Sequence, residues 1–263
     1  MHENLKKFLD QIVEATIYNA YHFLESDSFN EHEKEIAEKL KIICTSHFIR
    51  ERQNKLNSLM NLKKVGFAPS LVVDVGAQIG TPELYQAFPD SYHIFVEPVA
   101  ECIPSLREIS KNLRACTIYN CAVSNMNGET KLSLSDTRQY SSIDAEIGTE
   151  SRKIEVRTVD SIYEEIGNHE SILLKIDVDG IELKVLQGSR SLFNNECVII
   201  IEATLGDKNP RFNTLVEYLS AYGFKVFDIV DPLYRPRDWH LWQVDLVFVK
   251  KESQLWNNFS YLD

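Results

Sequence analysis

The strongest constraint on the fold is a series of short, almost continuously apolar segments that alternate with helix-like patterns after Ser70. Such segments are typical of strands in a parallel sheet that helices cover on both faces. The expected strands are residues 71–75, 93–97, 117–123, 172–177, 198–202, 224–230 and 244–250. The residues between the last two strands contain Pro232 and Pro236 and leave no room for a helix, so that pair should be antiparallel. The sequence therefore predicts an α/β fold with a mostly parallel sheet and one reversed strand at its end.

Helices are expected between the strands, and the clearest begins at Thr81. Thr81 suits the N-cap position and Pro82 the first helical position, which predicts a helix over residues 81–88. Further helical patterns cover residues 181–193 and 213–222, and two extra strands are expected at residues 131–135 and 154–158, on either side of an irregular stretch.

The N-terminal part of the chain has a different pattern. Apolar residues such as Leu5, Phe8 and Ile12 recur at intervals of three and four, as they do on one face of a helix. The pattern predicts a helical segment over residues 1–66 that precedes a main domain over residues 67–263. Because the apolar stripes are too extensive to face water, these helices are expected to cover the main domain or to form a homodimer interface.

Composition excludes several classes of function. The 263 residues include 28 Lys and Arg against 39 Asp and Glu, a formal net charge of −11, whereas proteins that neutralise phosphates carry the opposite charge. Nucleic acid is therefore not an expected partner. The apolar runs are far shorter than the ~20 residues that span a membrane, and the N-terminus lacks the apolar region of a secretory signal. The five cysteines form no C-x-x-C pair, so reduced thiols and a cytoplasmic location are expected.

The turn after the first strand, Asp74-Val75-Gly76-Ala77-Gln78-Ile79-Gly80, is a candidate binding loop, because ligands of an open α/β sheet bind beyond the carboxyl ends of its strands. Its glycines let the backbone approach a ligand closely. The G-x-x-x-G spacing differs from that of dinucleotide-binding turns, and the Lys-Ser or Lys-Thr of a phosphate-binding loop is absent. The acid that precedes the glycines would repel a pyrophosphate and favours a cationic ligand.

Two further segments indicate an adenine nucleoside. Glu97 ends the second strand, 21 positions after Gly76, and an acid at about that distance accepts ribose hydroxyls. After the third strand, Asn120 offers an amide that could read an adenine edge, and Ala122 and Val123 are small enough to sandwich the ring. Core packing explains Ala122 and Val123 equally well.

Charged residues are densest in Lys175-Ile176-Asp177-Val178-Asp179-Gly180-Ile181-Glu182. Lys175 and Asp177 interrupt an apolar strand, where unpaired charge is costly, so they are expected to be functional. Helix capping is an alternative explanation for Asp179 or Glu182. Glu202 ends the neighbouring strand.

Together the motifs D-V-G-A-x-x-G, F-V-E-P, A-V-S, K-I-D-V-D-G-I-E-L-K-V-L-Q-G, I-I-E and L-W-Q-V-D-L-V-F-V-K resemble the FkbM family of S-adenosylmethionine-dependent methyltransferases. They follow the family's order and spacing from about Ser70 to Lys251. The resemblance implies the seven-stranded, Rossmann-like class I methyltransferase fold and O-methylation of sugars, polyketides or related natural products. The chain departs from the family at Gln78, where Asn is usual, and at Asp179, where Glu is usual.

By this resemblance, Glu97 binds the ribose of S-adenosylmethionine, Ala122 and Val123 flank its adenine, and Asp177 faces the transferred methyl group. Asp74, Gly76 and Ala77 line its methionine part. The full set of residues expected to bind the cofactor is Asp74, Gly76, Ala77, Gln78, Gly80, Glu97, Pro98, Asn120, Ala122, Val123 and Asp177.

An alcohol acceptor has to lose a proton as the methyl group is transferred, and a positioned carboxylate can accept that proton. The expected base is Asp177, held in place by Lys175, with Glu202 as the third catalytic residue. Glu202, together with Gln243 and Asp245 near the last strand, either closes the substrate side of the pocket or simply finishes a strand. An alternative places a divalent cation such as Mg²⁺ or Ca²⁺ between Asp177 and Glu202, but the favoured prediction is a site without metal.

Residues 136–152 and 231–243 are the expected substrate-side loops. A small-molecule or glycan acceptor is expected to contact Ser141, Ser142, Asp179 and Trp239, although aromatic residues there also suit packing. Two other classes of function stay open. An NAD(P)-dependent oxidoreductase would need the missing glycine spacing, and a non-catalytic nucleoside-binding or interaction protein would use the N-terminal helices as its surface.

Overall fold

The computed structural model describes residues 54–134, 141–143, 150–206 and 211–256. The chain divides into two compact units, Met1–Asn54 and Lys55–Asp263, and the architecture below is that of the second. The helices predicted before Asn54, and their role as a cap or a dimer interface, lie outside the described residues. The division at residues 66 and 67 stays a prediction. Within the described part of the chain, no helix is long and apolar enough to cross a membrane.

Within the described residues, seven strands form the main sheet in the order β10-β11-β9-β8-β1-β2-β3. Their bounds are β1 (Leu71–Val75), β2 (Tyr92–Val96), β3 (Ala115–Tyr119), β8 (Ser171–Ile176), β9 (Glu196–Thr204), β10 (Phe224–Tyr234) and β11 (Leu241–Lys250). The pairs from β9 to β3 are parallel, and β11 is antiparallel to both of its neighbours. The mostly parallel sheet with a reversed strand is confirmed. The reversed strand lies one position inside the edge, however, because β10 pairs on its outer side.

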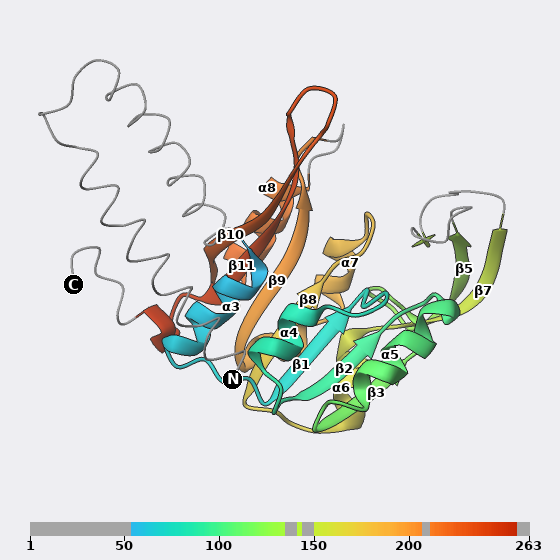
Figure 1. The fold of residues 1–263 in the computed structure, drawn as a ribbon, viewed down its shortest axis with the longest axis horizontal. Helices are drawn as coiled ribbons and strands as arrows, with labels where there is room; N and C mark the ends of the chain where they lie inside the picture. The colour runs from blue at the N-terminus through green and yellow to red at the C-terminus, as the bar shows by residue number, and fades with distance from the viewer. Residues whose placement is uncertain (1–53, 135–140, 144–149, 207–210, 257–263) are drawn as a thin grey trace, which may run out of the picture. The chain divides into compact units, whose positions relative to one another are not determined.

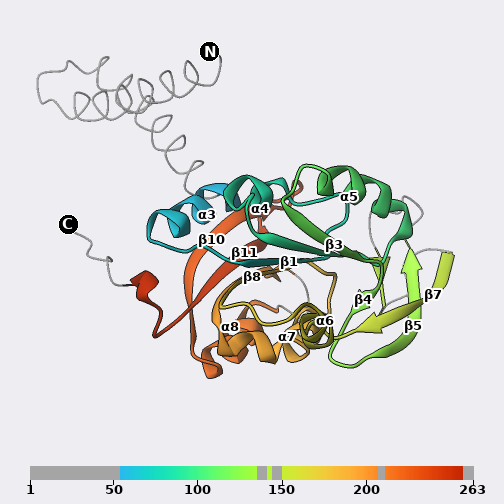
Figure 2. The same cartoon turned by 90° about the horizontal axis from the view of Figure 1, so that it is seen from below.

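Helices cover both faces of this sheet, as Figures 1 and 2 show. On one face lie α3 (Lys55–Lys64), α4 (Pro82–Ala87) and α5 (Ile103–Ser110), and on the other lie α6 (Val159–Ile166), α7 (Glu182–Gln187) and α8 (Phe212–Ala221). Short 3₁₀ helices are η1 (Ala100–Cys102), η2 (Arg190–Asn194) and η3 (Gln254–Trp256). Alternate residues of each strand enter opposite cores: in β1, Val73 packs with the α6 to α8 side and Val72 with Leu59 and Leu62 of α3.

A second sheet of the described residues has the order β4-β7-β5-β6. Its strands are β4 (Ala122–Val123), β5 (Gly128–Leu134), β6 (Ser141–Ser142) and β7 (Glu150–Arg157). The antiparallel pairing of β5 with β7 confirms the two extra strands. The single strand predicted over residues 117–123 is wrong, because the chain leaves the main sheet after Tyr119. Asn120 holds this exit: its side-chain amide donates to the carbonyls of Glu97 (2.8 Å) and Pro98 (3.1 Å).

The helix ends confirm some predictions and correct others. Thr81 and Pro82 stand at the N-cap and first positions of α4, as predicted. The helix expected over residues 181–193 is wrong, because α7 ends at Gln187 and a 3₁₀ turn follows. The loop expected over residues 231–243 is also shorter, since β10 and β11 extend into it. Pro232 is tolerated there because β10 is an edge strand whose register with β11 shifts between Val230 and Leu233.

Candidate functional site

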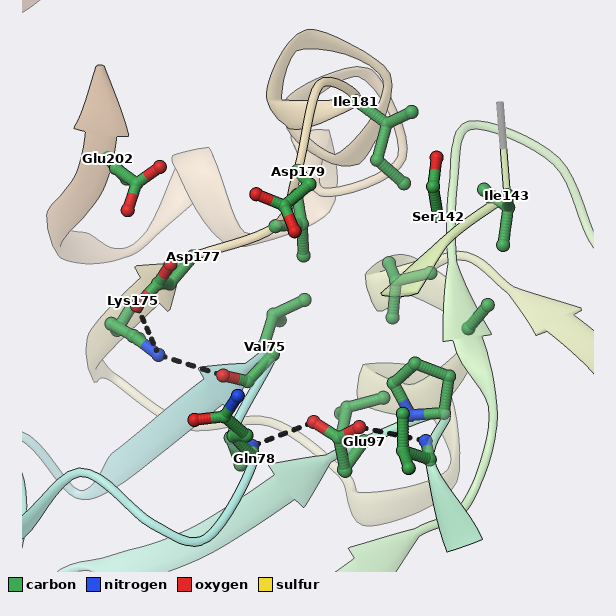
Figure 3. A pocket seen from close by; sticks show the side chains of 18 of the residues that line it. Val75, Gln78, Glu97, Ser142, Ile143, Lys175, Asp177, Asp179, Ile181 and Glu202 are labelled. Atoms are coloured by element: carbon green, nitrogen blue, oxygen red, sulfur yellow. Dashed lines mark hydrogen bonds and ion pairs between the residues drawn. The ribbon is translucent and has the colours of Figure 1, made fainter. Parts of the chain in front are cut away.

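A cavity of about 330 Å³ opens at the carboxyl ends of β1, β2, β8 and β9 (Figure 3). This is the edge at which the sequence predicted a ligand. The predicted residues that line it are Gly76, Ala77, Gln78, Gly80, Glu97, Pro98, Ala122, Val123, Ser142, Lys175, Asp177, Asp179 and Glu202. Three others lie outside its lining. Asp74 is fully buried beneath it, Asn120 braces the segment after β2, and the Trp239 side chain is 79% exposed on the β10–β11 hairpin. The side chain of Ser141 lies outside the described residues.

The glycine turn after β1 forms the floor of the cavity. Gly76 has φ +73°, and a Cβ at this position would lie 1.9 Å from the backbone oxygen of Asp177. The turn therefore packs directly against the end of β8, which only glycine permits. Gln78 also has a positive φ of 48°, and its backbone N–H donates to Glu97 (2.7 Å). The turn is thus tied to both neighbouring strands.

Glu97 presents its carboxylate at one end of the cavity. One oxygen accepts the N–H of Gln78 and the other accepts the N–H of Val99 at 2.8 Å (Figure 3). The side chain is buried, and this burial raises its pKa although the two N–H groups favour the charged form. Each oxygen keeps a second lone pair, so the carboxylate can accept two hydroxyl groups of a ligand.

Lys175 is the centre of a buried ion cluster. Its ammonium lies 3.0 Å from Asp74, 3.3 Å from Asp177 and 3.0 Å from the carbonyl of Gly76. Burial alone would lower the pKa of this ammonium, but the charges of Asp74 and Asp177 outweigh burial and raise it. Lys175 therefore stays charged, neutralises the acid under the glycine turn, and holds Asp177 from below. The sequence prediction that Lys175 positions Asp177 matches this arrangement.

The carboxyls of Asp177 and Glu202 lie at the opposite end of the cavity from Glu97 and influence each other electrostatically. Desolvation opposes ionisation of Asp177, but Lys175 and Lys55 outweigh it and hold its pKa below the usual range. Burial, together with the charges of Asp177 and Asp245, raises the pKa of Glu202 to about 8. Asp177 is therefore charged at neutral pH, while Glu202 is mostly protonated.

Several residues outside the predicted cofactor-binding and substrate-binding sets also line the cavity. The amide of Gln243, which the sequence associated with Glu202, donates to Glu202 at 2.5 Å and lines the cavity. Leu233 of the hairpin and Val99, Leu132, Ile143 and Ile181 add apolar walls. The apolar residues carry no sequence signal that distinguishes them from core residues. Gln243 differs from them, because it is a polar residue at the start of an apolar strand and was already named as a candidate in the sequence.

Glu182 is fully buried and outside the cavity lining. It accepts the N–H of Gly180 (3.1 Å) and lies 3.3 Å from the guanidinium of Arg211, so it stabilises the turn before α7. Asp179 lines the cavity, and burial and the charge of Asp177 raise its pKa. Neither acid caps α7 with its side chain, but Glu182 stands in the first turn of this helix, where its charge complements the helix dipole.

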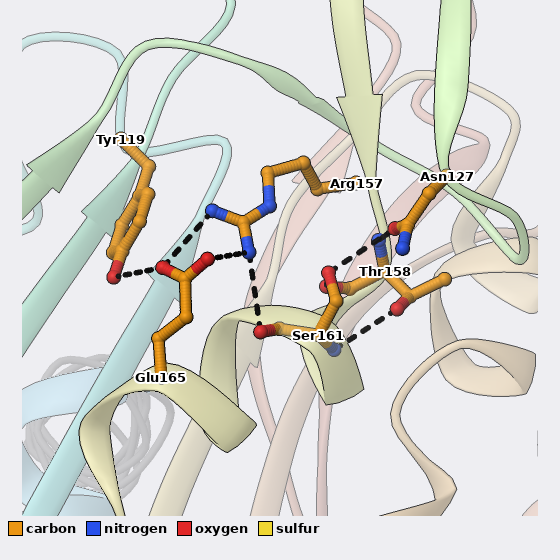
Figure 4. Close-up of polar contacts among 6 residues, drawn as sticks. All are labelled: Tyr119, Asn127, Arg157, Thr158, Ser161 and Glu165. Atoms are coloured by element: carbon orange, nitrogen blue, oxygen red, sulfur yellow. Dashed lines mark hydrogen bonds and ion pairs between the residues drawn. The ribbon is translucent and has the colours of Figure 1, made fainter.

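The second sheet supplies the wall beside Glu97, including Ala122 and Val123. It is anchored to β3 of the main sheet and to α6 by the polar contacts in Figure 4. Arg157, at the end of β7, lies 2.6 Å from Glu165 of α6, which also accepts the hydroxyl of Tyr119. These contacts hold the second sheet against β3 and α6, and with it the apolar side of the cavity.

The alternative of a divalent cation between Asp177 and Glu202 stays a prediction. Among the described residues, no group of three or more His, Cys, Asp and Glu side chains is arranged to hold a metal ion. Asp177, Asp179 and Glu202 line the cavity, and Lys175 compensates the charge of Asp177.

Comparison with known proteins adds a family. The model of the methyltransferase FkbM domain matches residues 74–226, more than half of the chain. The curated proteins gave no match.

Solved structures give remote likenesses. Precorrin-6y C5,15-methyltransferase from Geobacter metallireducens is 12% identical over 74% of this chain and 87% of that one, with a TM-score of 0.44. The 1,6-didemethyltoxoflavin-N1-methyltransferase of Burkholderia thailandensis is 14% identical over 87% and 93%, with a TM-score of 0.43. Ribosomal protein L11 methylase from Lactobacillus delbrueckii subsp. bulgaricus is 11% identical over 75% and 77%, with a TM-score of 0.45. At these values the likenesses carry no inference about activity.

Proposed function

The chain belongs to the FkbM methyltransferase domain family, and from this membership we propose that it transfers the methyl group of S-adenosylmethionine to a hydroxyl of a sugar, glycan or other natural product. The observation that carries the proposal is the two-ended cavity. A buried carboxylate with free lone pairs lies at one end, and a carboxyl pair that can take up a proton lies at the other.

The residues present fit this cofactor. Glu97 would accept the two ribose hydroxyls, and the apolar wall of Ala122 and Val123 would flank the adenine. The glycine turn would lie along the methionine part. The cofactor supplies an electrophilic methyl group on a positively charged sulfur, and Asp177 provides the negative charge that attracts it.

The cavity also holds the acceptor and the cofactor in the orientation that methyl transfer needs. Methyl transfer needs the acceptor oxygen, the methyl carbon and the sulfur in line, and fixed geometry of this kind contributes up to about 7–11 kcal/mol. Ser142, Asp179 and Leu233 line the cavity where an acceptor would enter, and Ser142 and Asp179 offer hydrogen-bonding groups to its hydroxyls. Trp239, further out on the hairpin, would contact only an acceptor that extends beyond the cavity.

The proton of the acceptor hydroxyl goes to the Asp177–Glu202 pair. The sequence pointed to Asp177 as the base, but its lowered pKa makes it a weak proton acceptor. A base whose pKa lies near the working pH is more effective, and Glu202 has that property in its deprotonated form. Asp177 then stays negatively charged and attracts the positively charged sulfur of the cofactor, while Lys175 compensates part of its charge.

Calorimetry with S-adenosylmethionine, S-adenosylhomocysteine and NAD tests the cofactor. The first two should bind at micromolar strength and NAD should not. Glu97→Gln should weaken both by about 10-fold or more, because hydrogen bonds to a charged group contribute roughly 1.5–3 kcal/mol. Glu217→Gln, an exposed change on α8, should leave both unchanged. Binding of NAD alone would contradict the proposal and favour an oxidoreductase.

Label transfer from methyl-labelled S-adenosylmethionine tests the acceptor. Two panels that differ only in the nucleophile are compared: methyl glycosides, and the same glycosides with an amine in place of one hydroxyl. Label is expected on oxygen in both panels. Label confined to nitrogen would show that the enzyme is an N-methyltransferase and not an O-methyltransferase. Failure to bind the cofactor at all would favour the alternative of a non-catalytic protein.

A further inference from the structure

Charged side chains form one continuous row across the face of the sheet that α3 covers. Lys175 of β8 pairs in register with Asp74 of β1, and Asp245 of β11 pairs in register with Glu202 of β9. Asp177 follows β8 at the level of Glu202. Neighbouring strands are about 4.8 Å apart, so the three carboxyls of Asp177, Glu202 and Asp245 lie side by side.

A lysine stands at each end of this row. Lys175 contacts Asp177 at one end, as described above. At the other end the ammonium of Lys55 lies 2.7 Å from Asp245 and 3.4 Å from Asp231. The side chains of Lys55 and Asp245 are only 12% and 11% exposed. Glu202 lies between the two ion pairs and accepts its hydrogen bond from the neutral amide of Gln243.

The position of Lys55 is not explained by the stability of its own helix. Lys55 is the first residue of α3, where a positive charge opposes the helix dipole, and the first turn of α3 contains no acidic residue. Asp231, from β10, compensates by accepting the backbone N–H of Lys55 at 3.2 Å. Leu59 and Leu62 pack α3 onto the sheet and so fix the lysine over Asp245.

We propose that Lys55 is a positioning residue for the proton-accepting pair: it holds Asp245 beside Glu202 and sets the charge that Glu202 experiences during methyl transfer. The inference rests on the proposed function for its catalytic meaning. It extends the site beyond residues 74–226 of the family match, because Lys55, Asp231, Gln243 and Asp245 all lie outside that range.

The direction of the effect follows from charge. Glu202 faces Asp177 and Asp179 from the β8–α7 turn and Asp245 and Gln243 from β11. Lys55 in turn faces Asp245, Asp231 and Asp177, and Lys175 is a like charge in the same row. Removing the positive charge of Lys55 leaves the row more negative, and a more negative neighbourhood raises the pKa of a carboxyl.

Carbon-13 NMR of the full chain with labelled glutamate carboxyls tests the proposal without cofactor or acceptor. The Glu202 signal is identified by its loss in Glu202→Gln. In Lys55→Met its titration midpoint should move upward by about one pH unit, the low end of what a neighbouring charge produces. Lys55→Arg should restore the wild-type midpoint, and Lys64→Met, an exposed change on the same helix, should leave it unchanged.

A second variant keeps the test valid if Lys55→Met does not fold. Asp245→Asn removes a negative charge, so the Glu202 midpoint should move in the opposite direction, to lower pH. An unchanged midpoint in both Lys55→Met and Asp245→Asn overturns the inference.

Methyl transfer supplies the catalytic readout. With an acceptor from the panels above, the rising limb of kcat against pH should follow the NMR midpoint in Lys55→Met, with the KM for S-adenosylmethionine unchanged. An NMR shift without a shift of that limb overturns the catalytic role of Lys55. Failure of the wild type to bind S-adenosylmethionine overturns the proposed function instead, so the two failures are distinguishable.

Discussion

At the scale of single residues, the site depends on how charges are compensated. Lys175 contacts Asp74, Asp177 and a backbone carbonyl, whereas Glu202 accepts a hydrogen bond from the neutral amide of Gln243 and has a raised pKa. The same strand edge therefore holds one acid that stays charged and one that exchanges a proton near neutral pH. Environments that give two neighbouring carboxyls very different pKa values are typical of catalytic pairs.

Removing Lys175 should destabilise the fold. Lys175→Met leaves Asp74 fully buried beneath the glycine turn with its positive partner gone. Breaking a buried ion pair costs about 3–5 kcal/mol. Urea unfolding should show a loss of this size, while Lys131→Met, an exposed change on β5, should stay within about 0.5 kcal/mol of wild type. Equal midpoints for the two variants would show that Lys175 is dispensable.

Removing the carboxyl of Glu202 should abolish the proton-accepting step. We expect Glu202→Gln to lower kcat roughly 10²–10⁴-fold, the usual contribution of a general base. In the wild type the rate should rise with pH through about 8, because only deprotonated Glu202 accepts a proton, and this limb should vanish in the variant. Steady-state rates from pH 6 to 9 check both points. A full rate in Glu202→Gln would return the role of base to Asp177.

At the scale of secondary structure elements, short turns position the site more than long helices do. The turn after β1 contacts the ends of both β2 and β8, and the segment after β2 is held by the amide of Asn120. Strand positions were predictable because burial on both faces leaves a run of apolar residues. The split between β3 and β4 was not predictable, because Asn120 ends β3 by donating to the carbonyls of Glu97 and Pro98, which lie 23 and 22 residues earlier.

The glycine turn allows a test at this scale. Gly76→Ala combines a positive φ with a Cβ that would overlap the backbone of Asp177, so the turn has to move. Backbone strain of this kind costs about 1–3 kcal/mol, and the displaced turn should also weaken S-adenosylmethionine binding. Calorimetry and thermal unfolding measure both effects. Gly128→Ala is the matched control, since a Cβ there meets no described atom within 4 Å. Wild-type affinity in Gly76→Ala would contradict the assigned role of the turn.

At the scale of the whole domain, the main sheet brings together acids that are distant in the chain. Asp74, Glu202 and Asp245 lie on β1, β9 and β11, and Asp177 directly follows β8; these strands are neighbours only in the sheet order β1-β8-β9-β11. Residues close in sequence, such as Asp177 and Glu182, are separated by the turn into α7, and the second of them leaves the cavity. The topology therefore decides which acids act together.

The raised pKa of Glu202 links the stability of the domain to pH. The folded state binds more protons than the unfolded state between the ordinary pKa of Glu, 4.5, and about 8. Stability contributed by this proton is present below pH 4.5 and is lost as pH rises through 8. Urea midpoints should therefore fall between pH 6.5 and 8.5, and the fall should be smaller in Glu202→Gln. A urea midpoint that rises with pH in the wild type would contradict a raised pKa of Glu202.

The sequence by itself determined the α/β class, the edge of the sheet where the cavity opens, and most of the residues that line it. These follow from local rules: a buried strand needs a continuous apolar run, and a chain that leaves a parallel strand has to turn at its carboxyl end. Only the tertiary structure decided that Glu202 holds a proton while Asp177 stays charged, and that Lys55 faces Asp245. The charge state of a carboxyl depends on its burial and on every charge within a few ångströms. Here those charges come from α3, β8, β9 and β11, whose order in space is not their order in the chain.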